Sequence, residues 1–119
     1  MTDEFQKFKE FRQKMDQKIL NKGNREINRF YALDKNAYNE GALSAETKEL
    51  LGLVGSLVLR CNDCITYHLW RCIQIGLSDE QLFEAFHISL VVGGSIIIPH
   101  LRKAVSMLEE IRSSHEFSG

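Results

Sequence analysis

The 119-residue sequence has little proline, little cysteine and no excess of charge of either sign. Its single proline is Pro99, so long helices are permitted almost throughout the chain. The 15 basic and 16 acidic residues leave a net charge of −1, which provides no basic field to attract nucleic acid. No apolar run approaches the ~20 residues that a membrane-spanning helix needs. We therefore expect neither a nucleic-acid partner nor a membrane partner.

Three cysteines are too few for the disulfide framework of a small secreted domain. The first residues, MTDEFQKFKEF, contain no apolar segment typical of a signal peptide. These two features predict a cytoplasmic protein. In that reducing compartment a Cys-x-x-Cys pair is more often catalytic or metal-binding than structural.

Apolar residues recur at helical spacing, and no alternating run is long enough to indicate a strand. The pattern predicts helices over residues 3–21, 25–38, 62–76, 79–92 and 95–112, and another that starts after Ser44 and includes Val58. Ser44 and Ser78 are suited to be N-caps, and Pro99 marks either a kink or the first turn of the last helix. We expect a single all-α domain, a bundle of five or six helices.

Within this domain, residues 1–23 are expected to form an N-terminal helix, residues 24–112 the core and residues 113–119 a polar tail. The helix that follows Ser44 is apolar nearly all round after Glu49, so we expect it to be buried. The next helix towards the N-terminus has an apolar side formed by Ile27, Phe30, Tyr31, Leu33 and Tyr38. So large an apolar load in a short chain predicts a homo-oligomer in which other subunits cover some helix faces.

The residues most suited to chemistry are Cys61, Cys64, His68 and Cys72, which share one predicted helix. At ~100° per residue they fall within an arc of about 80°, so all four face the same way. Backbone N–H groups at a helix start stabilise a thiolate, and a second thiol three residues away can close a disulfide. His68 can hold or relay the proton. We interpret Cys72 as a buried core residue, and His87 and His100 as ordinary surface or hydrogen-bonded histidines.

Glu49 is the last acidic residue before the apolar stretch of residues 50–59. It lies either in an exposed first helical turn or faces the site as a base. Twelve residues separate it from Cys61, which corresponds to about 18 Å of helix. On a simple helical hairpin Glu49 would therefore meet His68 or Cys72 rather than Cys61, and would serve the thiols only indirectly.

Two further interpretations of the cysteines remain open. A zinc site could use Cys61, Cys64, His68 and Cys72, but Cys61 and Cys72 lie about 16 Å apart along one straight helix, too far to share an ion. The protein could instead be a non-catalytic helical assembly protein, in which the cysteines have no redox role. We expect no bound metal and no cofactor.

The order Glu49, then Cys61-Asn62-Asp63-Cys64, then His68 resembles the AhpD-like alkylhydroperoxidase and carboxymuconolactone decarboxylase superfamily. The similarity extends over roughly residues 24–112 and includes Gly76-Leu77-Ser78 and Val92-Gly93-Gly94. The complete Glu…Cys-x-x-Cys-x-x-x-His set is the specific part of this resemblance. It implies an all-α fold assembled as a trimer or a hexamer.

The resemblance implies thiol-dependent reduction of hydroperoxides or disulfides in antioxidant defence. Cys64 would be the attacking thiolate, Cys61 the resolving thiol, and Glu49 and His68 the proton relay. A thiol reductant, such as a lipoyl or thioredoxin-like protein, would regenerate the dithiol. Asp63 stands where some peroxidase members have a histidine, and its carboxylate favours a disulfide reductase over a strong peroxidase. Lactone decarboxylation is the alternative, although decarboxylase members generally lack the cysteine pair.

Overall fold

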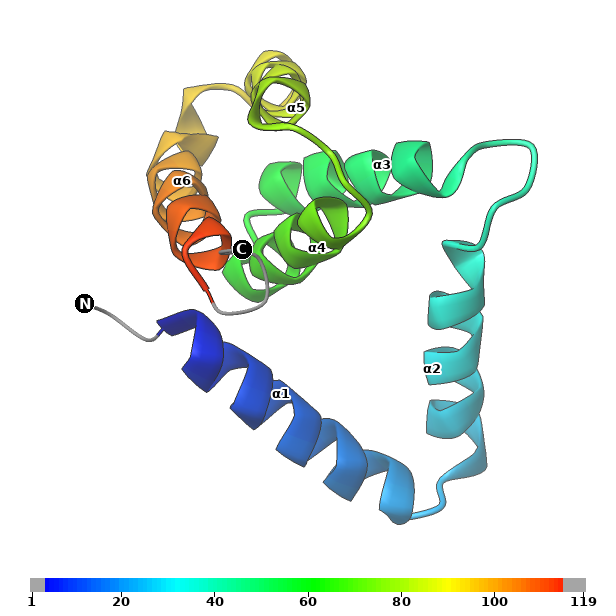
Figure 1. The fold of residues 1–119 in the computed structure, drawn as a ribbon. Coiled ribbons are helices and arrows are strands. Elements are labelled where there is room, and N and C mark those ends of the chain that lie inside the picture. The colour runs from blue at the N-terminus through cyan, green and yellow to red at the C-terminus, as the bar shows by residue number, and fades with distance from the viewer. Residues whose placement is uncertain (1–3, 115–119) are drawn as a thin grey trace.

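The computed structural model describes residues 4–114, and over this part of the chain it is built from helices alone (Figure 1). The elements are α1 (Glu4–Asn21), α2 (Arg25–Ala37), α3 (Ala45–Val58), α4 (Asn62–Gln74), α5 (Asp79–Gly93), the short 3-10 helix η1 (Ser95–Ile97) and α6 (Ile98–Arg112). The predicted all-α class with up to six α-helices is confirmed. Asp3, the predicted start of the first helix, and residues 115–119 of the predicted tail lie outside the described residues.

The helix starts follow local capping chemistry. The Ser44 hydroxyl accepts the backbone N–H of Thr47, and the Ser78 hydroxyl accepts that of Gln81. The Gln81 side chain in turn accepts the Ser78 backbone N–H, which completes the predicted capping box. Pro99 lies in the first turn of α6 and does not kink it.

Several helix ends differ from the predicted ones by a residue or two. The second helix ends at Ala37, with Tyr38 as its C-cap, and the fourth ends at Gln74, before Gly76 with φ 93°. The last helix is preceded by the 3-10 turn η1, because Gly94 (φ 82°) breaks the helical path between α5 and α6.

The apolar core lies between α3, α4, α5 and α6, which form the helical bundle. Its most deeply buried side chains include Leu53, Leu57, Leu69, Leu82, Phe86, Leu108 and Ile111. Helix α1 joins the bundle through its first turn, where Phe5 is buried in the core and its backbone N–H donates to Glu110 Oε1 at 2.8 Å. No helix between residues 4 and 114 is both long and apolar enough to cross a membrane.

Helix α2 departs from the expected packing, because it stands away from the bundle and buries none of its side chains (Figure 1). Phe30 is 65% exposed and Leu33 67% exposed, although both belong to its predicted apolar side. The expectation that α3 is buried holds for only one side of the helix, since Leu53 and Leu57 are buried whereas Leu51 is 56% exposed. Helical periodicity shows that a face is apolar, but it does not show which surface covers it.

Candidate functional site

The tight connection from α3 to α4 places the two cysteines. Arg60 adopts the left-handed conformation (φ 61°), and its N–H donates to Leu57 O. The N–H of Cys61 then donates to Ser56 O at 3.1 Å, so the chain reverses within three residues. Cys61 is thereby set as the N-cap of α4, where its Sγ accepts the backbone N–H of Cys64 at 3.3 Å.

Cys61 and Cys64 form a disulfide, with their Cα atoms 5.2 Å apart. Cys64 is exposed and Cys61 is half-buried, so the bond is open to a reactant from solvent. Backbone N–H groups at the start of α4 favour negative charge on these sulfur atoms after reduction. The pair therefore has the position and accessibility that a redox disulfide requires.

Cys72, the third cysteine, is buried and free. Burial is the main cause that raises the pKa of its thiol to about 12, and the Glu49 carboxylate adds to the effect. The thiol is therefore protonated at neutral pH and sits as a core side chain, in the position expected from the sequence.

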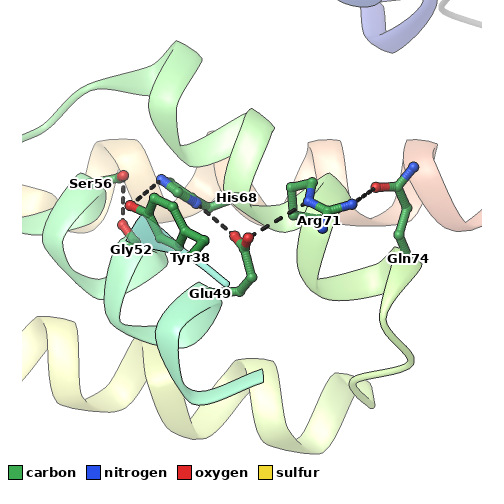
Figure 2. Close-up of polar contacts among 7 residues, drawn as sticks. All are labelled: Tyr38, Glu49, Gly52, Ser56, His68, Arg71 and Gln74. Carbon is green, nitrogen blue, oxygen red and sulfur yellow. Dashed lines mark hydrogen bonds and ion pairs between the residues drawn. The ribbon is translucent and has the colours of Figure 1, made fainter. Parts of the chain in front are cut away.

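One helical turn beyond the cysteines, the structure brings His68 and Glu49 together (Figure 2). His68 Nδ1 lies 3.0 Å from Glu49 Oε1, so the ring N–H donates to the carboxylate. Both residues are buried, with 8% of His68 and 3% of Glu49 exposed. Glu49 thus lies inside the protein rather than in an exposed first turn, and it contacts the histidine.

Two further side chains complete this cluster. Arg71 Nε lies 3.6 Å from Glu49 Oε2 and supplies a positive charge beside the buried carboxylate. The Tyr38 hydroxyl lies 3.4 Å from His68 Nε2, so both ring nitrogens have partners (Figure 2). A buried carboxylate needs such compensation, because an isolated charge is costly to desolvate.

The imidazole of His68 lies directly against the backbone of α3 at Gly52. A Cβ atom at Gly52 would come within 2.6 Å of the ring carbon Cε1 and within 2.9 Å of both ring nitrogens. Only glycine leaves room for the ring at this distance. Gly52 is therefore part of the seat that sets the orientation of His68.

A shallow hollow of about 460 Å³ leads from the solvent to His68. It runs along α3 and is lined by Tyr38, Gly52, Gly55, Ser56 and Leu59, among others. Its lining extends from Lys48, near the start of α3, to Leu59, which is two residues before Cys61 in the sequence. It provides a route by which a small molecule can approach the histidine.

The cysteine pair, His68 and Glu49 were predicted from the sequence, but three residues that surround His68 and Glu49 were not. Arg71 could have been found, since it follows His68 by one helical turn. Tyr38 and Gly52 carry no comparable signal, because they come from other helices. Among residues 4–114, no three His, Cys, Asp or Glu side chains are grouped in a way that could hold a metal ion.

Fold and site together define an all-α protein with an accessible Cys-x-x-Cys disulfide and a buried Glu–His pair. The model of the carboxymuconolactone decarboxylase family matches residues 27–107, well over half of the chain. This protein belongs to the carboxymuconolactone decarboxylase family.

A protein from Paracoccus denitrificans and a protein from Thermotoga maritima resemble this chain. "Uncharacterized protein 4 in cox locus" of Paracoccus denitrificans is 32% identical over 69% of this chain and 74% of its own length. A crystal structure from Thermotoga maritima is 57% identical with a TM-score of 0.85, and it covers 89% of this chain and 90% of that one. It is described as a carboxymuconolactone decarboxylase family protein with a suggested part in the antioxidative response.

A third structure shows the same fold at low sequence identity. The Legionella pneumophila protein lpg0406, of the same family, is 23% identical with a TM-score of 0.84, and covers 92% of this chain and 98% of its own. At that identity the likeness establishes the fold alone.

Proposed function

We propose that this protein is a thiol-dependent peroxidase or disulfide oxidoreductase that acts in antioxidant defence. The observation that carries the proposal is the accessible Cys61–Cys64 disulfide at the start of α4, the helix that also holds His68 against the buried carboxylate of Glu49. The suggested antioxidative role of the Thermotoga maritima relative supports it.

In the oxidative half-reaction, the Cys64 thiolate attacks the terminal oxygen of a hydroperoxide and the O–O bond breaks. The departing alkoxide takes a proton, which His68 and Glu49 supply, and leaves as an alcohol. Cys64 is then a sulfenic acid. The Cys61 thiol attacks its sulfur, an S–S bond forms and water leaves, so that two thiols and one hydroperoxide become a disulfide, an alcohol and water.

In the reductive half-reaction, a dithiol partner of the lipoyl or thioredoxin-like kind reduces the disulfide. Its thiolate attacks Cys64, the more exposed sulfur, and forms a mixed disulfide. Cys61 leaves as a thiolate, and the backbone N–H of Cys64 that now faces its Sγ stabilises this charge. The second thiol of the partner then releases the reduced protein and becomes half of the partner's own disulfide.

We further propose that the protein works as a homo-oligomer, a trimer or a hexamer, in the cytoplasm, where thiol reductants are available. Exposed apolar side chains on α2 and on α5 support an assembly that covers them; they include Phe30, Leu33, Ile88, Val91 and Val92.

A thiol count tests the proposed function. After reduction, the wild-type protein has three thiols, and one equivalent of an organic hydroperoxide should leave one, Cys72. Cys72→Ala should still lose both of its thiols, whereas Cys64→Ser should form no intramolecular disulfide. A wild-type thiol count that stays at three after peroxide and after a disulfide substrate would contradict both forms of the proposal.

A further inference from the structure

The C-terminal end of α2 is fastened to the body of the protein, although the rest of the helix is not packed on the bundle. The Lys48 ammonium donates to the backbone carbonyls of Ala37 at 2.9 Å and Asn39 at 2.6 Å. These carbonyls flank Tyr38 on both sides. Lys48 therefore holds in place the residue whose hydroxyl meets His68.

Lys48 and Glu49 are neighbours in the first turns of α3, and they hold two sides of one cluster. Lys48 donates hydrogen bonds to the backbone on either side of Tyr38, while the Glu49 carboxylate accepts a hydrogen bond from Nδ1–H of His68. Between these two supports, the Tyr38 hydroxyl meets His68 Nε2 at 3.4 Å, with the two rings 5.2 Å apart (Figure 2). Tyr38, the C-cap of α2, is half-buried here, although α2 itself buries none of its side chains.

Since Nδ1 of His68 is committed to Glu49, Nε2 is the ring nitrogen available to exchange protons. When the ring is neutral, Nε2 accepts a hydrogen bond from the Tyr38 hydroxyl. When the ring is protonated, Nε2–H donates to the same oxygen. A hydroxyl can serve in both directions, so the contact is preserved while a proton arrives or leaves.

We propose that Tyr38 is a positioning residue of the thiol site, whose hydroxyl holds Nε2 of His68 towards the hollow along α3 while Lys48 holds Tyr38 in place. This inference rests on the proposed function for its catalytic consequence, but the arrangement of the three side chains can be tested separately. Burial, followed by the charges of Asp34 and Glu49, raises the pKa of Tyr38, which keeps its hydroxyl protonated at neutral pH.

Tyr38→Phe is the direct test, because it removes the hydroxyl and keeps the ring. Tyr31→Phe is a matched control, since Tyr31 lies on α2, the helix that Tyr38 caps, and its hydroxyl donates to Asp16 at 3.0 Å rather than to His68. We expect Tyr38→Phe to lower kcat for a hydroperoxide about tenfold, which corresponds to about 1.4 kcal/mol, with KM unchanged. Tyr31→Phe should leave kcat unchanged.

Nitrogen NMR of the histidine rings supplies a readout that does not depend on turnover. In Tyr38→Phe the Nε2 signal of His68 should move towards that of an imidazole nitrogen with no hydrogen-bond donor, and Tyr31→Phe should leave it in place. Lys48→Met, which removes the ammonium but keeps the length of the chain, should move the same signal in the same direction and also reduce kcat.

The outcomes separate the inference from the proposed function. An unchanged His68 signal in Tyr38→Phe overturns the inference, and so does a moved signal with undiminished kcat. Absence of turnover in the wild type would instead overturn the proposed function. The NMR comparison between the two tyrosine variants would still decide whether Tyr38 holds His68.

Discussion

At the scale of single residues, the proposed function gives the buried pair of Glu49 and His68 the proton transfer that accompanies the chemistry of the cysteines. We expect His68→Ala and Glu49→Gln each to slow turnover by ~10²–10⁴-fold, the usual range for loss of a general acid–base group. The double variant should be little slower than either single variant, because the two side chains are in direct contact and, under the proposed function, would act as one relay. Steady-state kinetics with a hydroperoxide would measure this. Full activity in Glu49→Gln would leave only the cysteines and His68 in the mechanism.

Gly52 tests how closely the orientation of His68 is controlled. Gly52→Ala places a methyl group where the imidazole now lies, so the ring must move away from Glu49 or from Tyr38. Since a misplacement of about 1 Å can cost ~10²-fold in rate, we expect a loss of that order with the helical content retained. Gly55→Ala is the matched control, because its Cβ meets no atom within 4 Å. Equal activity of the two variants would show that the seat at Gly52 is not needed.

The buried thiol of Cys72 should make the stability of the folded protein depend on pH. Its folded-state pKa is raised from 9.0 to about 12, chiefly by burial. Below pH 9 the thiol is protonated in both states, and above it the unfolded chain releases a proton that the folded protein keeps. The free energy of unfolding should therefore fall as the pH rises from 9 towards 12.

Urea denaturation at several pH values would measure this decline. In Cys72→Ala the fall between pH 9 and 12 should be smaller, whatever the loss of stability at neutral pH. The comparison isolates Cys72, because Tyr38, whose pKa is also raised, is present in both proteins. Parallel stability curves for the two proteins would contradict the role given to the buried thiol.

At the scale of elements, the α3–α4 turn places a residue with a strained backbone, Arg60, directly before the Cys61–Cys64 disulfide. Arg60 has φ 61°, a conformation that costs roughly 1–2 kcal/mol for a residue with a side chain. Glycine removes this cost but adds about 0.5–1 kcal/mol of chain entropy. We expect Arg60→Gly to stabilise the protein by about 0.5–1 kcal/mol in thermal or urea unfolding.

Arg60→Ala is the control for this turn, since it removes the same charge but keeps a Cβ atom. Its stability should stay close to that of the wild type. If Arg60→Gly and Arg60→Ala unfold alike, backbone strain at Arg60 is not the cause of any change.

At the scale of the whole molecule, a single chain leaves apolar faces of α2 and α5 exposed to solvent. Phe30 and Leu33 on α2 are each about two-thirds exposed (65% and 67%), and burial of such a side chain contributes roughly 1.5–3 kcal/mol. We expect sedimentation to show a homo-oligomer at micromolar concentration. The double variant Phe30→Ser, Leu33→Ser should dissociate more readily. A wild-type monomer under these conditions would exclude the assembly.

Local chemistry in the sequence determined much of this protein. Serine caps, glycines and Pro99 set the helix boundaries to within a residue or two, because they act on the backbone next to them in the chain. The spacing of Cys61, Cys64 and His68 on one helix depends only on helical geometry, so it too could be predicted. The length of helix between Glu49 and the cysteines was enough to predict that Glu49 would lie near His68 or Cys72 rather than near Cys61.

Only the tertiary structure decided what surrounds that histidine. Tyr38 is thirty residues away from His68 in sequence and follows a helix, α2, that stands away from the bundle. Gly52 matters because the imidazole of His68 packs directly against its backbone. Neither contact follows from periodicity, which identifies an apolar face but not the surface that meets it. The same limit explains α2, which was expected to be part of the bundle although α3–α6 form most of the core without it, since packing depends on how whole helices meet in space.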